Sequence, residues 1–116
     1  DAAYREGEID LLGCVAPAGT REQPAGSALV VDYKTGGSPA ETAEQLHEKH
    51  LLQATCYAYA VLLEGYAQVE CVFARVEQDR ADAPGQPQTV SYRFDAADAD
   101  EMGRALARAY HGHGQL

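Results

Sequence analysis

An acid and a lysine stand two residues apart at the end of an aliphatic run, in the segment LVVDYKTG at residues 29–36. In an extended strand, the first and third side chains of such a triplet leave the same face, about 6.6 Å apart along the chain. Asp32 and Lys34 therefore point the same way from a strand whose other residues suit a core. A second acid, Asp10, lies in the preceding segment GEID, and a hairpin could place it beside Asp32.

Two carboxylates and a lysine at the end of a sheet are the groups that metal-assisted phosphodiester hydrolysis requires. Carboxylates bind Mg²⁺ or Mn²⁺ through hard oxygen ligands. The metal polarises the phosphate and lowers the pKa of a bound water, and a lysine can orient that water or offset charge on the phosphorus. The simpler interpretation is that Asp32 and Lys34 form a surface ion pair, with Asp10 as an acid in a turn.

A polar strip on a predicted helix argues against the simpler interpretation. Gln53 and Tyr57 are four residues apart in QATCYAYA, which places them on one helix face. His50 lies on that face one turn earlier, among neighbours that are mostly Leu, Ala and Val. The strand with Asp10, the strand with Asp32 and Lys34, and this helix follow one another directly in the chain.

The strands that must position these groups are predicted from apolar runs and partial alternation. We expect strands over residues 5–15, 27–34, 66–77 and 88–94, with loops over the segments 16–26 and 78–87, which are rich in Pro and polar residues. In the third strand Val69, Cys71, Phe73 and Arg75 should share one face.

Two helices complete the predicted fold. Ser38 is a good N-cap before Pro39, and the first helix should run to about Glu64 with Gly65 as its C-cap. Asp95 or Asp98 should cap a last helix that reaches about Tyr110, followed by a frayed HGHGQL tail. The predicted order is β-β-α-β-β-α, an α/β fold with a mixed central sheet of about four strands flanked by helices.

Composition sets further limits. The chain has 116 residues, enough for one domain spanning 1–116, and 46% apolar residues, enough for a core. Its net charge of −9 by itself argues against nucleic acid as a partner. No apolar run approaches the roughly 20 residues that span a bilayer. Three cysteines lack metal-type spacing, so Cys14, Cys56 and Cys71 are predicted to be reduced, mostly buried thiols in a cytosolic protein.

The motifs GEID (7–10), VVDYKTG (30–36) and QATCY (53–57) resemble the nuclease domain of the RecB-like branch of the PD-(D/E)XK superfamily. That domain is usually found at the C-terminus of UvrD-type helicase subunits in bacterial recombination complexes of the RecBCD and AddAB kinds. The resemblance covers residues 7 to about 75 and implies a restriction-endonuclease-like core.

The resemblance also implies a role for each matching residue. It makes Asp10 and Asp32 ligands of Mg²⁺ or Mn²⁺, with the backbone carbonyl of Tyr33 as a third ligand, and it makes Lys34 the catalytic lysine. Gln53, Tyr57 and His50 would support the site and the DNA strand.

The activity so implied is that of an Mg²⁺-dependent DNA exonuclease, acting on DNA ends in double-strand-break repair and recombination. Its partners would be a single DNA strand fed from a helicase, helicase domains in cis and a partner subunit, in the cytoplasm. In such enzymes the helicase grips the DNA, and the metal offsets local acidity, which weakens the objection from net charge.

Departures from the family pattern limit what this chain is expected to do alone. The family has a helix before GxID that supplies a further ligand. Because the chain starts too late to contain it, we expect a truncated nuclease core that could be inactive by itself. His47 and His50 follow the DYK triplet and cannot simply replace that ligand. No cysteine follows Cys71, so no iron–sulfur cluster is expected.

Three alternatives remain open on the sequence. A free-standing exonuclease of the CRISPR-associated or phage type would share the motifs, although the CRISPR-associated enzymes normally carry clustered cysteines. A degenerate nuclease fold could serve as a scaffold or a DNA-end-binding module, although Asp10, Asp32 and Lys34 are all intact. An acidic α/β interaction domain would use none of these groups for chemistry.

Overall fold

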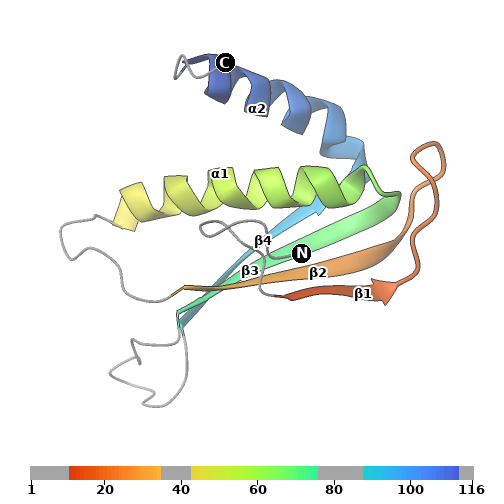
Figure 1. The fold of residues 1–116 in the computed structure, drawn as a ribbon, viewed down its shortest axis with the longest axis horizontal. Helices are drawn as coiled ribbons and strands as arrows, with labels where there is room; N and C mark the ends of the chain where they lie inside the picture. The colour runs from red at the N-terminus through yellow and green to blue at the C-terminus, as the bar shows by residue number, and fades with distance from the viewer. Residues whose placement is uncertain (1–10, 35–42, 76–87, 113–116) are drawn as a thin grey trace.

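The computed structural model describes residues 11–34, 43–75 and 88–112. Its elements are the strands β1 (Leu11–Ala16) and β2 (Ala25–Lys34), the helix α1 (Ala43–Leu62), the strands β3 (Tyr66–Arg75) and β4 (Gln88–Asp95), a 3₁₀ turn (Ala96–Asp98) and the helix α2 (Ala99–Gly112). The predicted order of strands and helices is confirmed, and so is the mixed four-stranded sheet (Figure 1).

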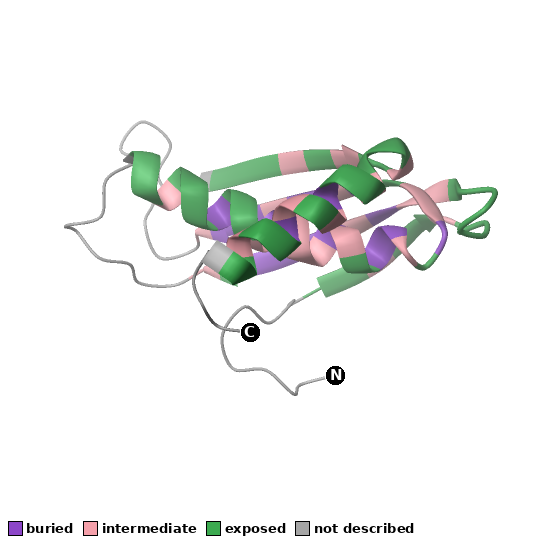
Figure 2. Ribbon diagram, turned by 90° about the horizontal axis from the view of Figure 1, so that it is seen from above, coloured by how far each residue is buried: buried purple, intermediate pink, exposed green. Residues whose placement is uncertain are grey.

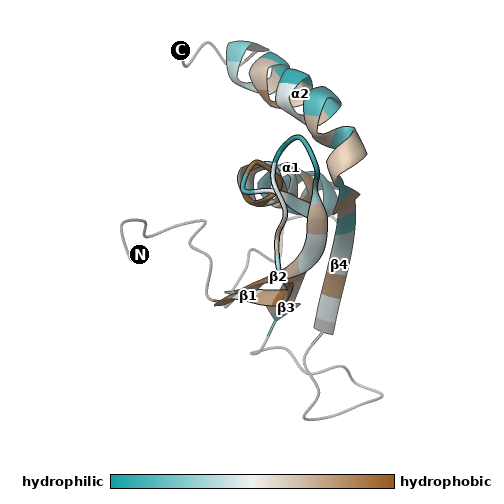
Figure 3. Cartoon of the chain, turned by 90° about the vertical axis from the view of Figure 1, so that its right-hand side faces the viewer, coloured by the Kyte–Doolittle hydropathy of each residue, from teal (hydrophilic) through white to brown (hydrophobic). Residues whose placement is uncertain are grey.

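The strands lie in the order β1-β2-β3-β4, with β1 antiparallel to β2 and β3 antiparallel to β4. The central pair, β2 and β3, is parallel, so the chain must cross from the end of β2 back to the start of β3. That crossing contains α1, which lies across one face of the sheet, with α2 stacked on α1 (Figures 1 and 3). The C-terminal ends of β2 and β3 therefore lie side by side at one end of the sheet.

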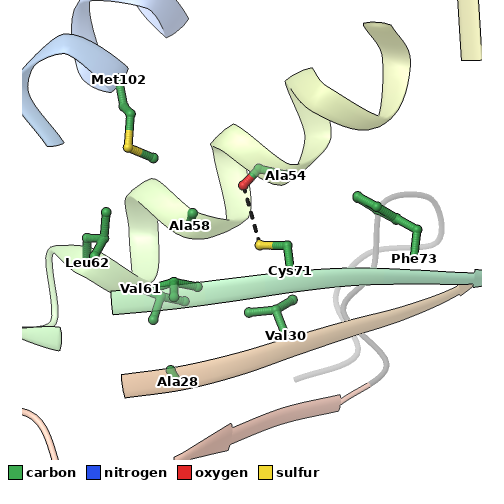
Figure 4. Close-up of a cluster of buried hydrophobic side chains, with 10 residues drawn as sticks. Ala28, Val30, Ala54, Ala58, Val61, Leu62, Cys71, Phe73 and Met102 are labelled. Carbon is green, nitrogen blue, oxygen red and sulfur yellow. Dashed lines mark hydrogen bonds between the residues drawn. The ribbon is translucent and has the colours of Figure 1, made fainter. Parts of the chain in front are cut away.

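The core lies between α1 and the two central strands, where most of the buried residues gather (Figure 2). Ala54 and Ala58 of α1 are completely buried, and their small side chains let the helix approach the sheet closely. The Cys71 thiol donates a hydrogen bond to the Ala54 carbonyl over 3.6 Å (Figure 4). The other buried residues of this core are Ala28, Val30, Val61, Leu62, Val69, Phe73 and Met102.

Gly65 follows α1 and joins its end to the turn between β1 and β2. Its φ of 109° favours glycine, and its carbonyl accepts hydrogen bonds from the backbone N–H groups of Gly19 (2.9 Å) and Ala25 (3.1 Å). A Cβ at this position would lie 2.5 Å from the Gly19 carbonyl oxygen. Gly65 thus closes the tight turn that follows α1, and we call this set of backbone bonds the Gly65 clasp.

Helix α2 packs on α1 through a narrow apolar stripe. Met102 and Leu106, one turn apart, are buried. A Cβ at Gly103 would lie 2.8 Å from the Tyr59 hydroxyl, so glycine allows the close approach of the two helices here. The 3₁₀ turn begins directly after Asp95, in agreement with one of the two predicted caps.

Several predicted boundaries differ from the structure. The loop predicted over 16–26 is shorter, because Ala16 pairs with Ser27 after a shift in register that follows Cys14. Helix α1 ends at Leu62 rather than Glu64, since the N–H groups of Glu64 and Gly65 bond three residues back in a tighter turn. Helix α2 continues to Gly112, so the tail predicted to fray begins as helix. The predictions for 5–10, for the helix start at Ser38 and for 76–87 lie outside the described residues.

The cysteines are all free thiols, but they are not mostly buried as predicted. Cys71 is buried beneath α1, Cys56 is partly exposed, and Cys14 is exposed on the edge strand β1. An edge strand has a neighbour on one side only, which explains why an apolar-looking segment leaves its thiol in water. Burial, assisted by the Glu70 charge, raises the pKa of Cys71 to about 12.

None of the helices in the described part of the chain combines the length and the apolar character that crossing a bilayer requires.

Candidate active site

The parallel strands β2 and β3 bring four side chains together at one end of the sheet. Asp32 lies opposite Phe73, and Lys34 lies opposite Arg75. Asp32 and Lys34 follow Val30 in β2 at two-residue intervals, and Val30 faces the core under α1. Both side chains therefore leave the sheet on the helix side, as do those of Phe73 and Arg75, their partners in β3. The predicted common face of Asp32 and Lys34 therefore opens beneath the first half of α1.

Asp32 is the centre of this arrangement. The residue is only 4% exposed, and its Oδ2 atom accepts a hydrogen bond of 2.8 Å from the Tyr57 hydroxyl. The Lys34 Nζ atom lies 3.3 Å from the same oxygen. Burying a carboxylate is costly unless charge and hydrogen bonds compensate for it. The phenol and the ammonium supply both, so Asp32 and Lys34 are not the surface ion pair of the simpler interpretation.

Lys34 is held from two sides. Besides Asp32, its Nζ atom lies 5.6 Å from the centroid of the Phe73 ring, within the range of a cation–π contact. Its side chain remains 25% exposed, against 5% for that of Asp32. The lysine thus presents a positive charge at the mouth of the site, while the acid lies behind it.

Helix α1 contributes a histidine and a tyrosine to the same place. His50 is 6% exposed, and its ring stacks on Phe73 with centroids 4.6 Å apart and planes 8° apart. The Tyr57 ring lies 6.4 Å from the Phe73 ring at a tilt of 32°. Phe73 therefore acts as a central support that fixes the helix residues against the lysine.

Gln53 behaves differently from its predicted partners on the helix. It is partly exposed, so water can solvate its amide, and no buried amide has to find a partner. Among the described residues, no hydrogen bond joins its side chain to Asp32 or Lys34. The structure brings Tyr57 and His50 into the arrangement around Phe73, and the role predicted for Gln53 stays a prediction.

A pocket next to Lys34 was not predicted. His47 and Tyr92 are joined by a hydrogen bond of 3.0 Å between Nδ1 and the hydroxyl, and the Tyr92 ring meets Phe73 edge-on. These rings, with Lys34 and Arg75, line a pocket of about 210 Å³. The available signal was the alternation of Val90, Tyr92 and Phe94 in the last strand, which places Tyr92 on the helix face only once the register with β3 is known.

The metal assignment depends on a residue that the structure does not describe. Asp10 lies outside the described residues. Tyr33 is 51% exposed, on the face of the sheet away from Asp32, so its backbone is the part that could contribute to a metal site. Within 11–34, 43–75 and 88–112, no three His, Cys, Asp or Glu side chains are grouped closely enough to hold a metal ion.

Comparison of the chain with models of protein families gave a match. The model of the PD-(D/E)XK nuclease superfamily matches residues 6–114. The chain therefore belongs to the PD-(D/E)XK nuclease superfamily, whose members are generally hydrolases that cleave nucleic acids and typically use divalent metals. Comparisons with curated proteins and with solved structures each gave no match.

Proposed function

We propose that this chain is the catalytic domain of an Mg²⁺- or Mn²⁺-dependent DNA exonuclease that hydrolyses phosphodiester bonds at DNA ends. The observation that supports this most strongly is the buried Asp32 carboxylate, held by Lys34 and Tyr57 where β2 and β3 end side by side. Burying a carboxylate beside a lysine that stays partly exposed is costly, and a catalytic role for the pair accounts for that cost.

Asp10 and Asp32 would hold the metal, with the Tyr33 carbonyl as a third ligand. Carboxylate and carbonyl oxygens are the donors that Mg²⁺ prefers, and Asp32 meets that requirement. Asp10 directly precedes Leu11, and Leu11 pairs with Val31, the residue before Asp32. When bound, the metal would polarise the phosphate and lower the pKa of the attacking water.

The remaining roles follow from the contacts. The Lys34 ammonium, partly exposed at the mouth of the site, would offset negative charge that develops on the phosphate oxygens. Tyr57 orients the Asp32 carboxylate through its hydroxyl. Phe73, under both Lys34 and His50, keeps the lysine from swinging into solvent.

We further propose that the domain works beside a helicase in double-strand-break repair or recombination in the cytoplasm. A chain with a net charge of −9 gains little from phosphate contacts of its own. Helicase domains in cis and a partner subunit would grip the DNA and feed one strand to Lys34. Gln53, Tyr57 and His50, on α1, would support the site and the strand.

Calorimetric titration with Mn²⁺ tests the metal site. The wild-type chain should bind Mn²⁺, and the double variant Asp10→Ala/Asp32→Ala should not. A matched control is Asp98→Ala/Asp100→Ala, which removes the same charge near the start of α2. Equal affinity of the wild type and the Asp10/Asp32 variant would overturn the ligand assignment.

Cleavage assays test the rest of the proposal. Linear DNA should be degraded in Mg²⁺ and covalently closed circular DNA should not, because an exonuclease needs an end. In the protein that contains this chain, ATP-driven unwinding should survive Lys34→Gln while cleavage is lost. Degradation of closed circles would exclude an exonuclease, and loss of unwinding together with cleavage would contradict a separate nuclease domain.

A further inference from the structure

The pocket beside Lys34 has walls of unusual composition for an acidic protein. Its aromatic rings come from His47 of α1, Phe73 of β3 and Tyr92 of β4. Its two cations, Lys34 and Arg75, lie at the ends of the central strands β2 and β3. Planar rings offer stacking surfaces, and cations offer contacts to phosphate. The walls thus combine the two kinds of group that bind a nucleotide.

The volume of the pocket limits the size of the ligand that it can hold. Pockets for drug-sized ligands begin at roughly 300 Å³, and this pocket measures about 210 Å³. One planar ring system fits such a space better than a whole nucleotide does. The sugar and the phosphate would have to remain outside, toward solvent.

The position of the pocket relates it to the cleavage site. Lys34 belongs to both, since its Nζ atom contacts the Asp32 carboxylate and its side chain lines the pocket. Phe73, part of the pocket wall, is paired with Asp32 across the two strands. A base in the pocket would therefore place its own phosphate next to the lysine.

The walls of the pocket are held in place by contacts with one another. The hydrogen bond between His47 and Tyr92 ties the start of α1 to β4. The His47 and Tyr92 rings lie 5.6 Å apart at 39°, and Tyr92 meets Phe73 at 6.0 Å and 75°. Such mutual support keeps aromatic side chains preorganised, which lowers the entropic cost of binding.

We propose that this pocket binds one unpaired nucleobase of the strand being cleaved, stacked against Tyr92 and His47, and so positions the neighbouring phosphate at Lys34. The identity of that strand rests on the proposed function, but binding of the base does not require cleavage. The pocket would recognise the base by its flat face, so it favours single-stranded DNA over paired DNA and is tolerant of sequence.

The test uses two probes that differ by the base alone. The 116-residue chain is titrated in EDTA with 2′-deoxyadenosine 5′-monophosphate and with 2-deoxyribose 5-phosphate, and binding is followed by the aromatic proton resonances. One base–aromatic stack is worth roughly 1–3 kcal/mol. The dissociation constant of the nucleotide should therefore be at least about fivefold lower than that of the sugar phosphate.

Two variants test whether the pocket is the source of the preference for the nucleotide over the sugar phosphate. Tyr92→Leu and His47→Leu should each reduce it to less than about twofold, while Tyr110→Leu, a tyrosine of α2 outside the pocket, should keep it. Circular dichroism identifies any variant that fails to fold, and the other variant then decides. Equal binding of the two probes by the wild type, or a preference unchanged in both pocket variants, would overturn the proposal.

Failure of the pocket and failure of the nuclease assignment are distinguishable. A chain that degrades linear DNA but binds the two probes equally has the activity without the base pocket. If the chain prefers the nucleotide while the protein that contains it cleaves nothing in Mg²⁺, the base pocket stands and the proposed activity is refuted.

Discussion

The two ends of the β2–β3 pair are built from the same helix and the same strands, yet they contain opposite kinds of residue. At the end near Gly65, Ala28 and Val69 meet Val61 and Leu62 in a dry apolar cluster. At the other end, Asp32 and Lys34 meet the polar aromatic residues of α1. The comparison indicates that one end fixes the helix on the sheet and leaves the other end free to bury charge.

The two ends also differ in whether their contacts come from the backbone or from particular side chains. The Gly65 clasp consists of backbone hydrogen bonds, which any folded chain can make once glycine allows the approach. The Asp32 end depends on specific side chains, because the Lys34 ammonium and the Tyr57 hydroxyl compensate the charge of the buried carboxylate. Substitutions at the first end should therefore affect stability, and substitutions at the second should affect chemistry first.

The largest effect on stability should come from Leu62→Ala at the apolar end. Leu62 is 4% exposed, and truncating a buried leucine to alanine typically costs 2–5 kcal/mol, here expected at about 3 kcal/mol of unfolding free energy. Urea unfolding measures it. Leu51→Ala, on the same helix but 41% exposed, is the matched control and should stay within about 0.5 kcal/mol. Similar losses in both variants would contradict an anchoring role for this end.

Lys34→Gln should have the next largest effect, on catalysis. The amide keeps a hydrogen-bond donor for Asp32 but removes the charge, and losing one electrostatic stabiliser of a transition state costs about 10²- to 10³-fold in rate. Release of acid-soluble nucleotides from linear DNA measures it. Arg104→Gln, the same loss of charge on α2, should leave the rate within about twofold. Cleavage by Lys34→Gln at the wild-type rate would remove the lysine from the mechanism.

Tyr57→Phe should separate hydrogen bonding from packing at the Asp32 end, because it removes only the hydroxyl that bonds Asp32. A hydrogen bond to a charged group contributes about 1.5–3 kcal/mol, so the unfolding free energy should fall by about 2 kcal/mol. In an Asp32→Asn background the same substitution should cost less than about 1 kcal/mol, since the charge is gone. An unchanged cost in that background would mean that Tyr57 acts by packing alone.

The smallest effect should be a change in the alkaline pH dependence of stability. Burial raises the pKa of Cys71 from its ordinary value of 9.0 to about 12. Its contribution is therefore complete below pH 9 and is lost as the pH rises to about 12, at up to about 1.4 kcal/mol per pH unit. In Cys71→Ala, the free energy of unfolding should fall less steeply over this range. Parallel urea titrations at pH 8 to 11 that gave equal slopes would argue against a buried neutral thiol.

The parts of the site that sequence could predict are those set within one segment. The common face of Asp32 and Lys34 follows from strand geometry, and the turn at Gly65 follows from a glycine after an apolar helix. The position of Tyr57 on the strip with His50 follows from helical spacing. Each of these needs no knowledge of any other element.

The rest depends on how separate elements meet. The register that sets Phe73 beside Asp32 is decided by packing along the whole parallel pair, not by either strand alone. The bond between His47 and Tyr92 needs the crossing of α1 over β4.

The parallel pairing of β2 and β3 also sets the order in which the site can form during synthesis. Tyr57 follows Asp32 by 25 residues, and Phe73 lies further along in β3. Until residues 66–75 have left the ribosome, Asp32 and Lys34 have no strand to pair with on that side and remain hydrated. Non-local pairing of this kind is slow, because a long loop must close first. The charged end of the sheet is therefore among the last parts of the nascent chain to become an organised site.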